Sequence, residues 1–220
     1  MNIEFDIFKT SKPILSKLKE YGFKYTLNKY VYEKNINNDL FKIIITIENN
    51  KVSGKIIDLQ TNLEYLNYRL NNLGEFSSNI KEQYISILKD IYNNCFEKEN
   101  FIFSQSNRIS KLIYEKYKVN PEFLWSKYPN IGVFRNKDNN KWFGIIMNIN
   151  KNILDNKSNK EIEVINIKLD KKVQEYLLYD GIYEAYHMNK KNWVSIALDE
   201  TMKDKEIMNL IDISYNLTNK

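Results

Sequence analysis

Short stretches of alternating apolar and polar residues, joined by Asn-rich turns, constrain this chain most. Residues 41–47 and 51–59 are two such stretches, and only Glu48, Asn49 and Asn50 separate them. Alternation gives each strand two chemically different faces, and a short Asn-rich connection is typical of a β-hairpin. The pattern therefore favours antiparallel pairing of neighbouring strands, with the helical stretches left to cover a sheet.

The first hundred residues predict a helix, three strands and a second helix. The first helix is expected over residues 12–21, with Pro13 at an early position and Gly22 ending it. The strands are expected over residues 23–32, 41–47 and 51–59. Apolar side chains at helical spacing then predict a long helix over residues 77–96.

The second half begins after a polar stretch at residues 97–100. Helices are expected over residues 106–117, 170–180 and 203–217, with a short helical turn after Pro121. Strands are expected over residues 132–136, 142–149, 161–169, 183–187 and 193–198. We expect these strands to form one continuous, mainly antiparallel sheet, on which the helices near 107–117 and 203–217 pack. Alternation assigns Val194, Ile196 and Leu198 to the core.

The order of elements predicts an α+β fold, in which helices cover a mainly antiparallel sheet. A smaller α-β-β-β-α domain is expected to precede it, with domains at residues 1–100 and 101–220. A chain of 220 residues can bury a core of its own, so a metal or disulfide is not required to stabilise it.

The formal net charge is +5. Residues 1–99 carry +1 and residues 100–220 carry +4, so the excess lies in the second half. Lys, Asn and Ile are abundant throughout, which a preference for AT-rich codons would also produce. The charge by itself therefore does not indicate nucleic-acid binding, which requires basic residues clustered on one face.

Composition excludes several kinds of chemistry. The chain holds one Cys, Cys95, and one His, His187, so it cannot build a Cys/His zinc site or an internal disulfide. The six glycines are widely separated and form no phosphate-binding loop. Cys95 is expected to be a buried, inert thiol, and Glu161 and Glu163 are expected on a solvated strand edge. We therefore expect no catalysis, no cofactor and no metal.

No apolar run approaches the ~18 residues of a membrane span. The first residues lack the basic and apolar regions of a signal peptide. These features predict a cytoplasmic protein without a membrane partner.

Several separated motifs resemble those of the MmcQ/YjbR-like family. The main one is the stretch from Tyr183 to Trp193, and others lie at residues 130–135, 142–144, 164–169, 198–199 and 207–215. The resemblance covers residues 105–217, and residues 1–100 resemble the N-terminal extension of clostridial-type members. It implies a fold similar to frataxin-like and secretion-chaperone-like proteins. It also implies DNA binding through a double-wing arrangement, an inference that rests on the fold.

Two expected hairpin tips carry the residues that suit such a role. The first tip holds Arg135, Lys137, Lys141 and Trp142. The second holds His187, Asn189, Lys190, Lys191 and Trp193. Cations and amides bind phosphates, and an indole ring can stack on a base or sugar. A Lys-rich surface of ordinary solvated turns would look the same. Trp125 and Phe134 are assigned to the core.

The sequence leaves three functions open. The first is weak binding to the DNA phosphate backbone through the two tips. The second is a protein-interaction or chaperone-like module without a nucleic-acid role, in which the sheet or a helical face docks a peptide. The N-terminal half is a candidate for an interaction module, because its charge is balanced and its strands can leave an edge open for pairing. An enzyme of unknown type is the third.

Overall fold

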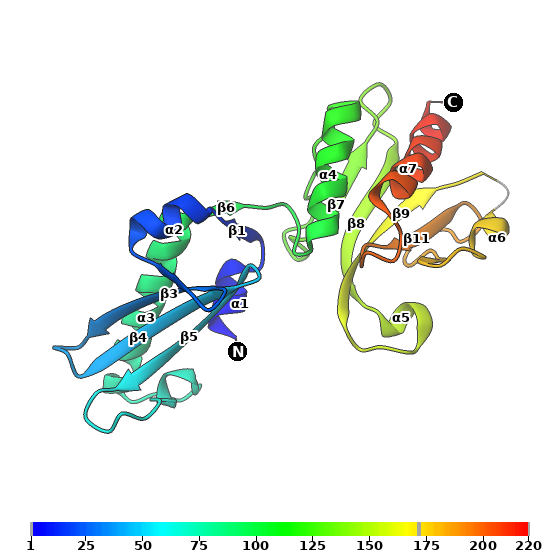
Figure 1. Ribbon diagram of the computed structural model, residues 1–220. Helices are drawn as coiled ribbons and strands as arrows, with labels where there is room; N and C mark the ends of the chain where they lie inside the picture. The colour runs from blue at the N-terminus through cyan, green and yellow to red at the C-terminus, as the bar shows by residue number, and fades with distance from the viewer. Residues whose placement is uncertain (1, 171–172, 220) are drawn as a thin grey trace. The chain divides into compact units, whose positions relative to one another are not determined.

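The computed structural model describes residues 2–170 and 173–219. The chain divides into two compact units, Met1–Glu99 and Asn100–Lys220 (Figure 1). Each unit combines helices with an antiparallel sheet, so the fold is α+β as predicted.

The first unit holds a four-stranded antiparallel sheet in the order β2-β3-β4-β5. Its strands are β2 (Lys24–Thr26), β3 (Lys29–Ile36), β4 (Phe41–Glu48) and β5 (Lys51–Asp58). Its helical segments are α1 (Ile3–Phe8), α2 (Leu15–Tyr21), η1 (Asn67–Arg69) and α3 (Glu75–Cys95). Two short strands, β1 (Ser11–Pro13) and β6 (Phe96–Lys98), pair with each other outside this sheet.

Alternation along β4 explains how this unit builds its core. Ile43 and Ile45 are fully buried, whereas Ile44 between them stays partly exposed. The buried face joins a cluster that includes Leu88 and Ile91 of α3. One amphipathic helix therefore covers one face of the sheet, and the other face, which carries Ile44, stays partly exposed.

The prediction of one strand over residues 23–32 is wrong, because the chain turns at Leu27 and Asn28. Both residues adopt left-handed backbone angles, with φ of 47° and 61°, and separate β2 from β3. Pro13 lies in β1 rather than in a helix, and α2 begins two residues later. Gly22 ends α2 with a φ of 113°, as predicted.

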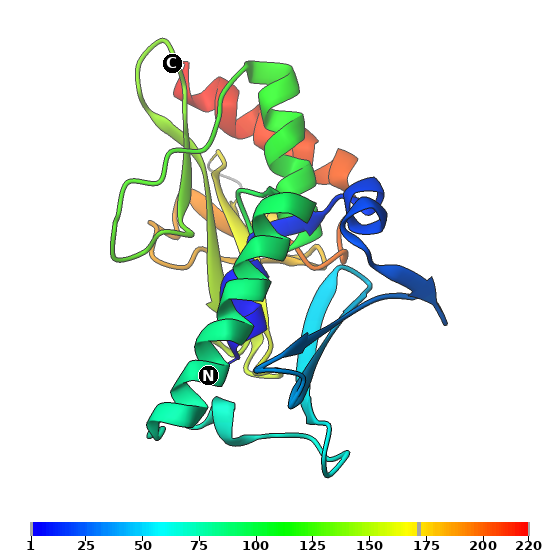
Figure 2. The same cartoon turned by 90° about the vertical axis from the view of Figure 1, so that its left-hand side faces the viewer.

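The second unit holds one continuous five-stranded antiparallel sheet in the order β10-β11-β9-β8-β7, which confirms the prediction. Its strands are β7 (Gly132–Arg135), β8 (Trp142–Asn150), β9 (Glu161–Lys168), β10 (Ile182–Glu184) and β11 (Trp193–Ala197). Its helices are α4 (Ser104–Tyr117), α5 (Asn152–Asp155), α6 (Val173–Tyr176) and α7 (Asp204–Thr218). The two long helices, α4 and α7, pack on one face of the sheet (Figures 1 and 2).

Both faces of this sheet are largely buried. Ile165 and Ile196 belong to the cluster beneath α4 and α7, together with Ile211 of α7. Ile145 and Val164 form a second cluster on the face without long helices. Because neighbouring residues point to opposite faces, a single strand such as β9 contributes apolar side chains to both clusters, with Val164 in one and Ile165 in the other.

Two helical predictions in this unit differ from the structure. The residues after Pro121 are not helical, because Glu122 exchanges two backbone hydrogen bonds of 2.9 Å with Val133 on β7. Of the helix expected over residues 170–180, the structure contains α6. The expected start of that helix includes residues 171–172, which lie outside the described residues.

A β-bulge interrupts the pairing of β7 with β8. Phe134 pairs with Gly144. The next residue, Arg135, pairs with Trp142, which leaves Phe143 as an extra residue. The bulge places Phe143 in the cluster beneath the helices, and Trp142 packs against the cluster on the other face.

Ser214 of α7 completes the hydrogen bonding at this bulge. Its hydroxyl accepts a hydrogen bond from the backbone N–H of Lys168 at 2.8 Å and donates one to the carbonyl of Phe143 at 2.6 Å. Ser214 is fully buried, so one hydroxyl satisfies two backbone groups that the sheet leaves unpaired.

Candidate nucleic-acid interface

The two predicted hairpin tips lie at the same end of the five-stranded sheet. The first tip, residues 136–141, joins β7 to β8, and the second, residues 185–192, joins β10 to β11. Trp193 at the start of β11 pairs with Lys168 at the end of β9. Gly144, near the start of β8, pairs with Ile167. Three strand spacings of ~4.8 Å separate the tips, which is roughly 14 Å.

A row of cations and indole rings crosses the sheet between the tips. Arg135, Trp142, Lys168 and Trp193 come from four neighbouring strands at this end. The bulge and the strand alternation place these side chains on the face without α4 and α7. The guanidinium of Arg135 lies 5.5 Å from the centre of the Trp142 ring. We call these four residues the cation–indole row. Lys168 was not among the predicted site residues.

The first tip is anchored to the end of α7. The side-chain amide of Asn136 donates to the Thr218 hydroxyl at 3.2 Å, and that of Asn139 donates to the Thr218 carbonyl at 2.6 Å. The side chains of Lys137 and Lys141 remain exposed. Arg135 forms an ion pair of 3.0 Å with Glu122, so a ligand phosphate has to compete with that carboxylate.

Asn189 gives the second tip its shape. Its carbonyl accepts hydrogen bonds of 3.0 Å from the N–H groups of Asn192 and Trp193, and its side chain accepts one from the N–H of Lys191. Lys190 forms an ion pair of 2.6 Å with Glu184, and both side chains are more than half exposed. Asn189 thus acts within the turn, and the exposed cations of the tip are Lys190 and Lys191.

A buried polar network supports the loop that enters the second tip. The Ser195 hydroxyl donates to the Asn166 side chain at 2.5 Å and accepts from the Tyr186 N–H at 2.9 Å. The Asn166 amide donates to the Tyr186 carbonyl at 2.8 Å. His187 follows with a left-handed φ of 57°, is exposed, and packs its ring 3.9 Å from that of Tyr186. Sequence reasoning missed this network, because it depends on which strands are neighbours.

Trp125 also belongs to this region, which corrects its assignment to the core. It is 37% exposed, and its ring meets that of Trp142 edge to face, with 6.0 Å between the ring centres. Phe134 is fully buried, as predicted. Trp142 and Trp193 are both half-buried, and Arg135 and Trp125 both contact Trp142.

Glu163 is buried, so the prediction of a solvated edge is wrong for this residue. It lies on β9, a central strand, and its carboxylate accepts hydrogen bonds from the N–H groups of Ile102 and Phe103 at 3.0 and 3.1 Å. Burial raises the pKa of Glu163 above its usual value, although these hydrogen bonds oppose the shift. The carboxylate holds the segment that leads into α4.

The described part of the chain offers little support for a reactive thiol, a metal site or a membrane span. Cys95 is buried, and burial raises the pKa of its thiol to about 11. No three His, Cys, Asp or Glu residues among those described gather in a way that could hold a metal ion. Within residues 2–170 and 173–219, no helix has the length and apolar character needed to cross a membrane.

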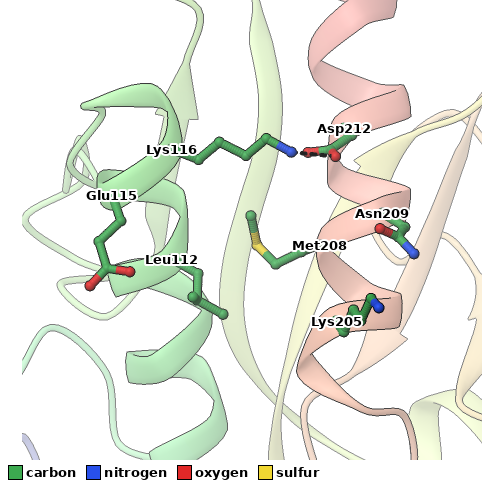
Figure 3. A pocket seen from close by; sticks show the side chains of 7 residues that line it. All are labelled: Leu112, Glu115, Lys116, Lys205, Met208, Asn209 and Asp212. Atoms are coloured by element: carbon green, nitrogen blue, oxygen red, sulfur yellow. Dashed lines mark hydrogen bonds and ion pairs between the residues drawn. The ribbon is translucent and has the colours of Figure 1, made fainter.

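A shallow groove of about 500 Å³ lies between α4 and α7, on the helical side of the unit (Figure 3). Leu112 and Met208 line its floor, and an ion pair between Lys116 and Asp212 closes one end. None of the predicted site residues lines this groove.

Comparison with known proteins agrees with the resemblance seen in the sequence. Residues 114–217 match the model of the YjbR family. The uncharacterised protein YyaQ of Bacillus subtilis is 39% identical over 111 residues, which is 50% of this chain and 94% of YyaQ. YbdF of Escherichia coli O157:H7 is 36% identical over 58 residues, 26% of this chain and 48% of YbdF. A crystal structure of a Pseudomonas syringae protein is 35% identical with a TM-score of 0.49, covering 50% of this chain and 96% of that one. The chain belongs to the YjbR family.

Proposed function

We propose that the second unit binds DNA weakly, through the phosphate backbone and without catalysis. One observation carries the proposal: the two basic tips lie at the same end of one sheet, with the cation–indole row between them. A nucleic-acid strand laid across this end would meet cations at both sides and an indole ring between them. Phosphate contacts of this kind position a protein on DNA without reading its sequence.

The ion pairs at the tips explain why the affinity is expected to be weak. Arg135 and Lys190 each already have a carboxylate partner, Glu122 and Glu184. A phosphate that replaces the carboxylate gains one charge-assisted contact while another is lost. About three to five phosphate contacts then correspond to the nonspecific range, with dissociation constants of roughly 10⁻⁴ to 10⁻⁶ M at physiological salt.

The experiment compares charge removal at each tip with equal charge removal elsewhere. Lys190→Ala with Lys191→Ala removes two cations from the second tip, and Lys137→Ala with Lys141→Ala removes two from the first. Lys111→Ala with Lys205→Ala removes the same charge from α4 and α7 and is the matched control. Fluorescence anisotropy with a labelled duplex of about 20 base pairs, in low salt, measures the affinity.

Each tip variant is expected to weaken binding by about tenfold, and by a similar factor for unrelated sequences. The control variant should bind nearly as tightly as the wild type. Equal losses in all three variants would mean that net charge alone attracts the DNA, and the proposal would be wrong. Wild-type binding that none of the variants weakens would also contradict it.

A further inference from the structure

The first unit exposes a group of large apolar side chains on the segment between β5 and α3 and at the start of α3. They are Leu59, Leu63, Leu66, Leu70 and Phe76, with Leu40 beside them, and each is between 38% and 69% exposed. Figure 2 shows this segment as a loop that leaves β5 and returns to the start of α3. We call these six residues the leucine surface.

Backbone and ring contacts bring one part of the leucine surface together. The N–H of Leu59 donates to the carbonyl of Leu40 at 2.9 Å, which joins the loop to the β3–β4 turn. The rings of Tyr65 and Phe76 lie 4.9 and 6.0 Å from the ring of Phe41. Leu40, Leu59 and Phe76 therefore lie close to one aromatic centre, and the other three leucines follow on the same short segment.

The segment is fixed to the core by the residues between Leu66 and Leu70. Tyr68 is fully buried. Arg69 donates to the buried carboxylate of Glu4 at 2.8 and 3.2 Å and to the Gly54 carbonyl at 2.6 Å. These contacts hold η1 against the unit and leave the flanking leucines exposed. Their exposure is thus built into the folded state and does not reflect a loose loop.

The size of the leucine surface suits a protein interface. An aromatic side chain contributes ~150–250 Å² when it is fully buried, and leucine lies near the lower end of that range. Six side chains exposed to this extent present on the order of 500 Å², at the upper end of the apolar patches found on monomers, roughly 300–600 Å². A standard interface covers about 800 Å² on each partner, so this surface with its polar rim reaches the area that a stable dimer needs.

The surroundings of the leucine surface favour a second copy of the chain as its partner. Exposed amides alternate with its side chains along the same segment, namely Gln60, Asn62, Asn67, Asn71 and Asn72. Each amide both donates and accepts hydrogen bonds, so this set of amides can pair with the identical set of a second copy across a two-fold axis. Within residues 59–76 the exposed charges are Glu64 and Glu75, and the cation Arg69 is paired with Glu4. A membrane or nucleic-acid surface would instead require exposed cations.

We propose that the leucine surface joins two copies of this chain in a symmetric dimer. This proposal is independent of DNA binding, because it uses other residues in the other unit. Apolar side chains at the centre of such an interface supply most of its free energy, and the amides fix the orientation of the two copies.

Sedimentation equilibrium of the full chain under reducing conditions tests the proposal. The wild type is expected to move from a mass of 26.4 kDa towards twice that value as its concentration rises. Leu63→Asp and Leu66→Asp, made separately, should each weaken dimerisation by roughly tenfold or more, since the dimer would bury both side chains. Leu27→Asp is the matched control, because Leu27 is 85% exposed in the β2–β3 turn of the same unit.

Thermal unfolding of each variant shows whether the fold is kept, and the exposed positions predict little change in the monomer. A wild type that stays monomeric up to about 100 µM, well above the dissociation constants typical of specific dimers, would overturn the proposal. A dimer that both Leu63→Asp and Leu66→Asp leave intact would place the interface elsewhere and overturn it as well. Equal weakening by Leu27→Asp would show general apolar association, not this surface.

Discussion

Ser214 shows how a single side chain can stabilise the sheet of the second unit. Replacing it with alanine leaves the buried N–H of Lys168 and the carbonyl of Phe143 without their common partner. We expect Ser214→Ala to lower the free energy of unfolding by about 1–3 kcal/mol, the usual cost of unpaired buried polar groups. Urea-induced unfolding of the wild type and the variant measures this difference in free energy.

Ser158→Ala is the matched control for this change. Ser158 accepts a weaker hydrogen bond of 3.3 Å in an exposed loop, so its loss should cost less than about 0.5 kcal/mol. Equal effects of the two substitutions would contradict the role assigned to Ser214.

Glu163 makes the stability of the second unit depend on pH. Burial raises the pKa of Glu163 above its usual value of 4.5. Between the usual and the raised pKa, the folded state therefore binds more protons than the unfolded state. Its contribution to stability is therefore full at low pH and falls as pH rises through this window. Glu4, Asp199 and Asp204 have lowered pKa values. Their contributions to stability are therefore full at higher pH and fall as pH decreases.

The variant Glu163→Gln isolates this dependence, because the other groups remain. The difference in unfolding free energy, wild type minus variant, is expected to decrease as pH rises from about 4.5. Unfolding curves in urea at several pH values provide the measurement. A difference that stays constant with pH, or that increases, would show that the folded state does not raise the pKa of Glu163.

Hairpins were the elements that the sequence predicted best, because each depends on residues close together in the chain. The strand pairs around residues 41–58 and 132–149 follow from alternation and an intervening polar turn. The turn at Leu27 was missed because leucine seldom adopts a positive φ. Strands β1 and β6 are three residues each and lie more than eighty residues apart, so local pattern could not reveal their pairing.

The candidate site was only partly predictable for the same reason. Cations near Trp142 and Trp193 are visible in the sequence, but whether the two tips share one end of the sheet depends on strand order. Lys168 joins the cation–indole row only because β9 lies between β8 and β11. Ion pairs such as Lys190 with Glu184 depend on side-chain positions that spacing does not fix.

At the scale of the hairpin, Asn139 links the first tip to α7. Its amide donates to the Thr218 carbonyl, and its oxygen accepts from the N–H of Lys141 at 3.0 Å. Asn139→Ala removes both bonds without changing charge, so hydrogen exchange in residues 136–141 should become faster. Hydrogen–deuterium exchange with mass spectrometry measures this. Unchanged exchange in that peptide would show that the tip does not need α7.

The whole molecule combines a nearly neutral first unit with a more basic second unit. Residues 1–99 carry a net charge of +1, and residues 100–220 carry +4. The matched family model covers residues 114–217, within the second unit. The similarity of residues 1–100 to a clostridial-type N-terminal extension stays a prediction. We propose a role in dimerisation for this first unit through the leucine surface, which its composition does not suggest.

The salt dependence of DNA affinity tests the central claim most directly. Cations that bind phosphates displace counterions, so about three to five contacts predict a slope of log K against log salt of roughly −3 to −4.5 on duplex DNA, at about −0.9 per phosphate. Fluorescence anisotropy at several salt concentrations measures the slope for the wild type. A slope near zero, or affinity no tighter than the ~10⁻⁴ M limit of nonspecific binding, would contradict phosphate binding and leave the tips as solvated turns.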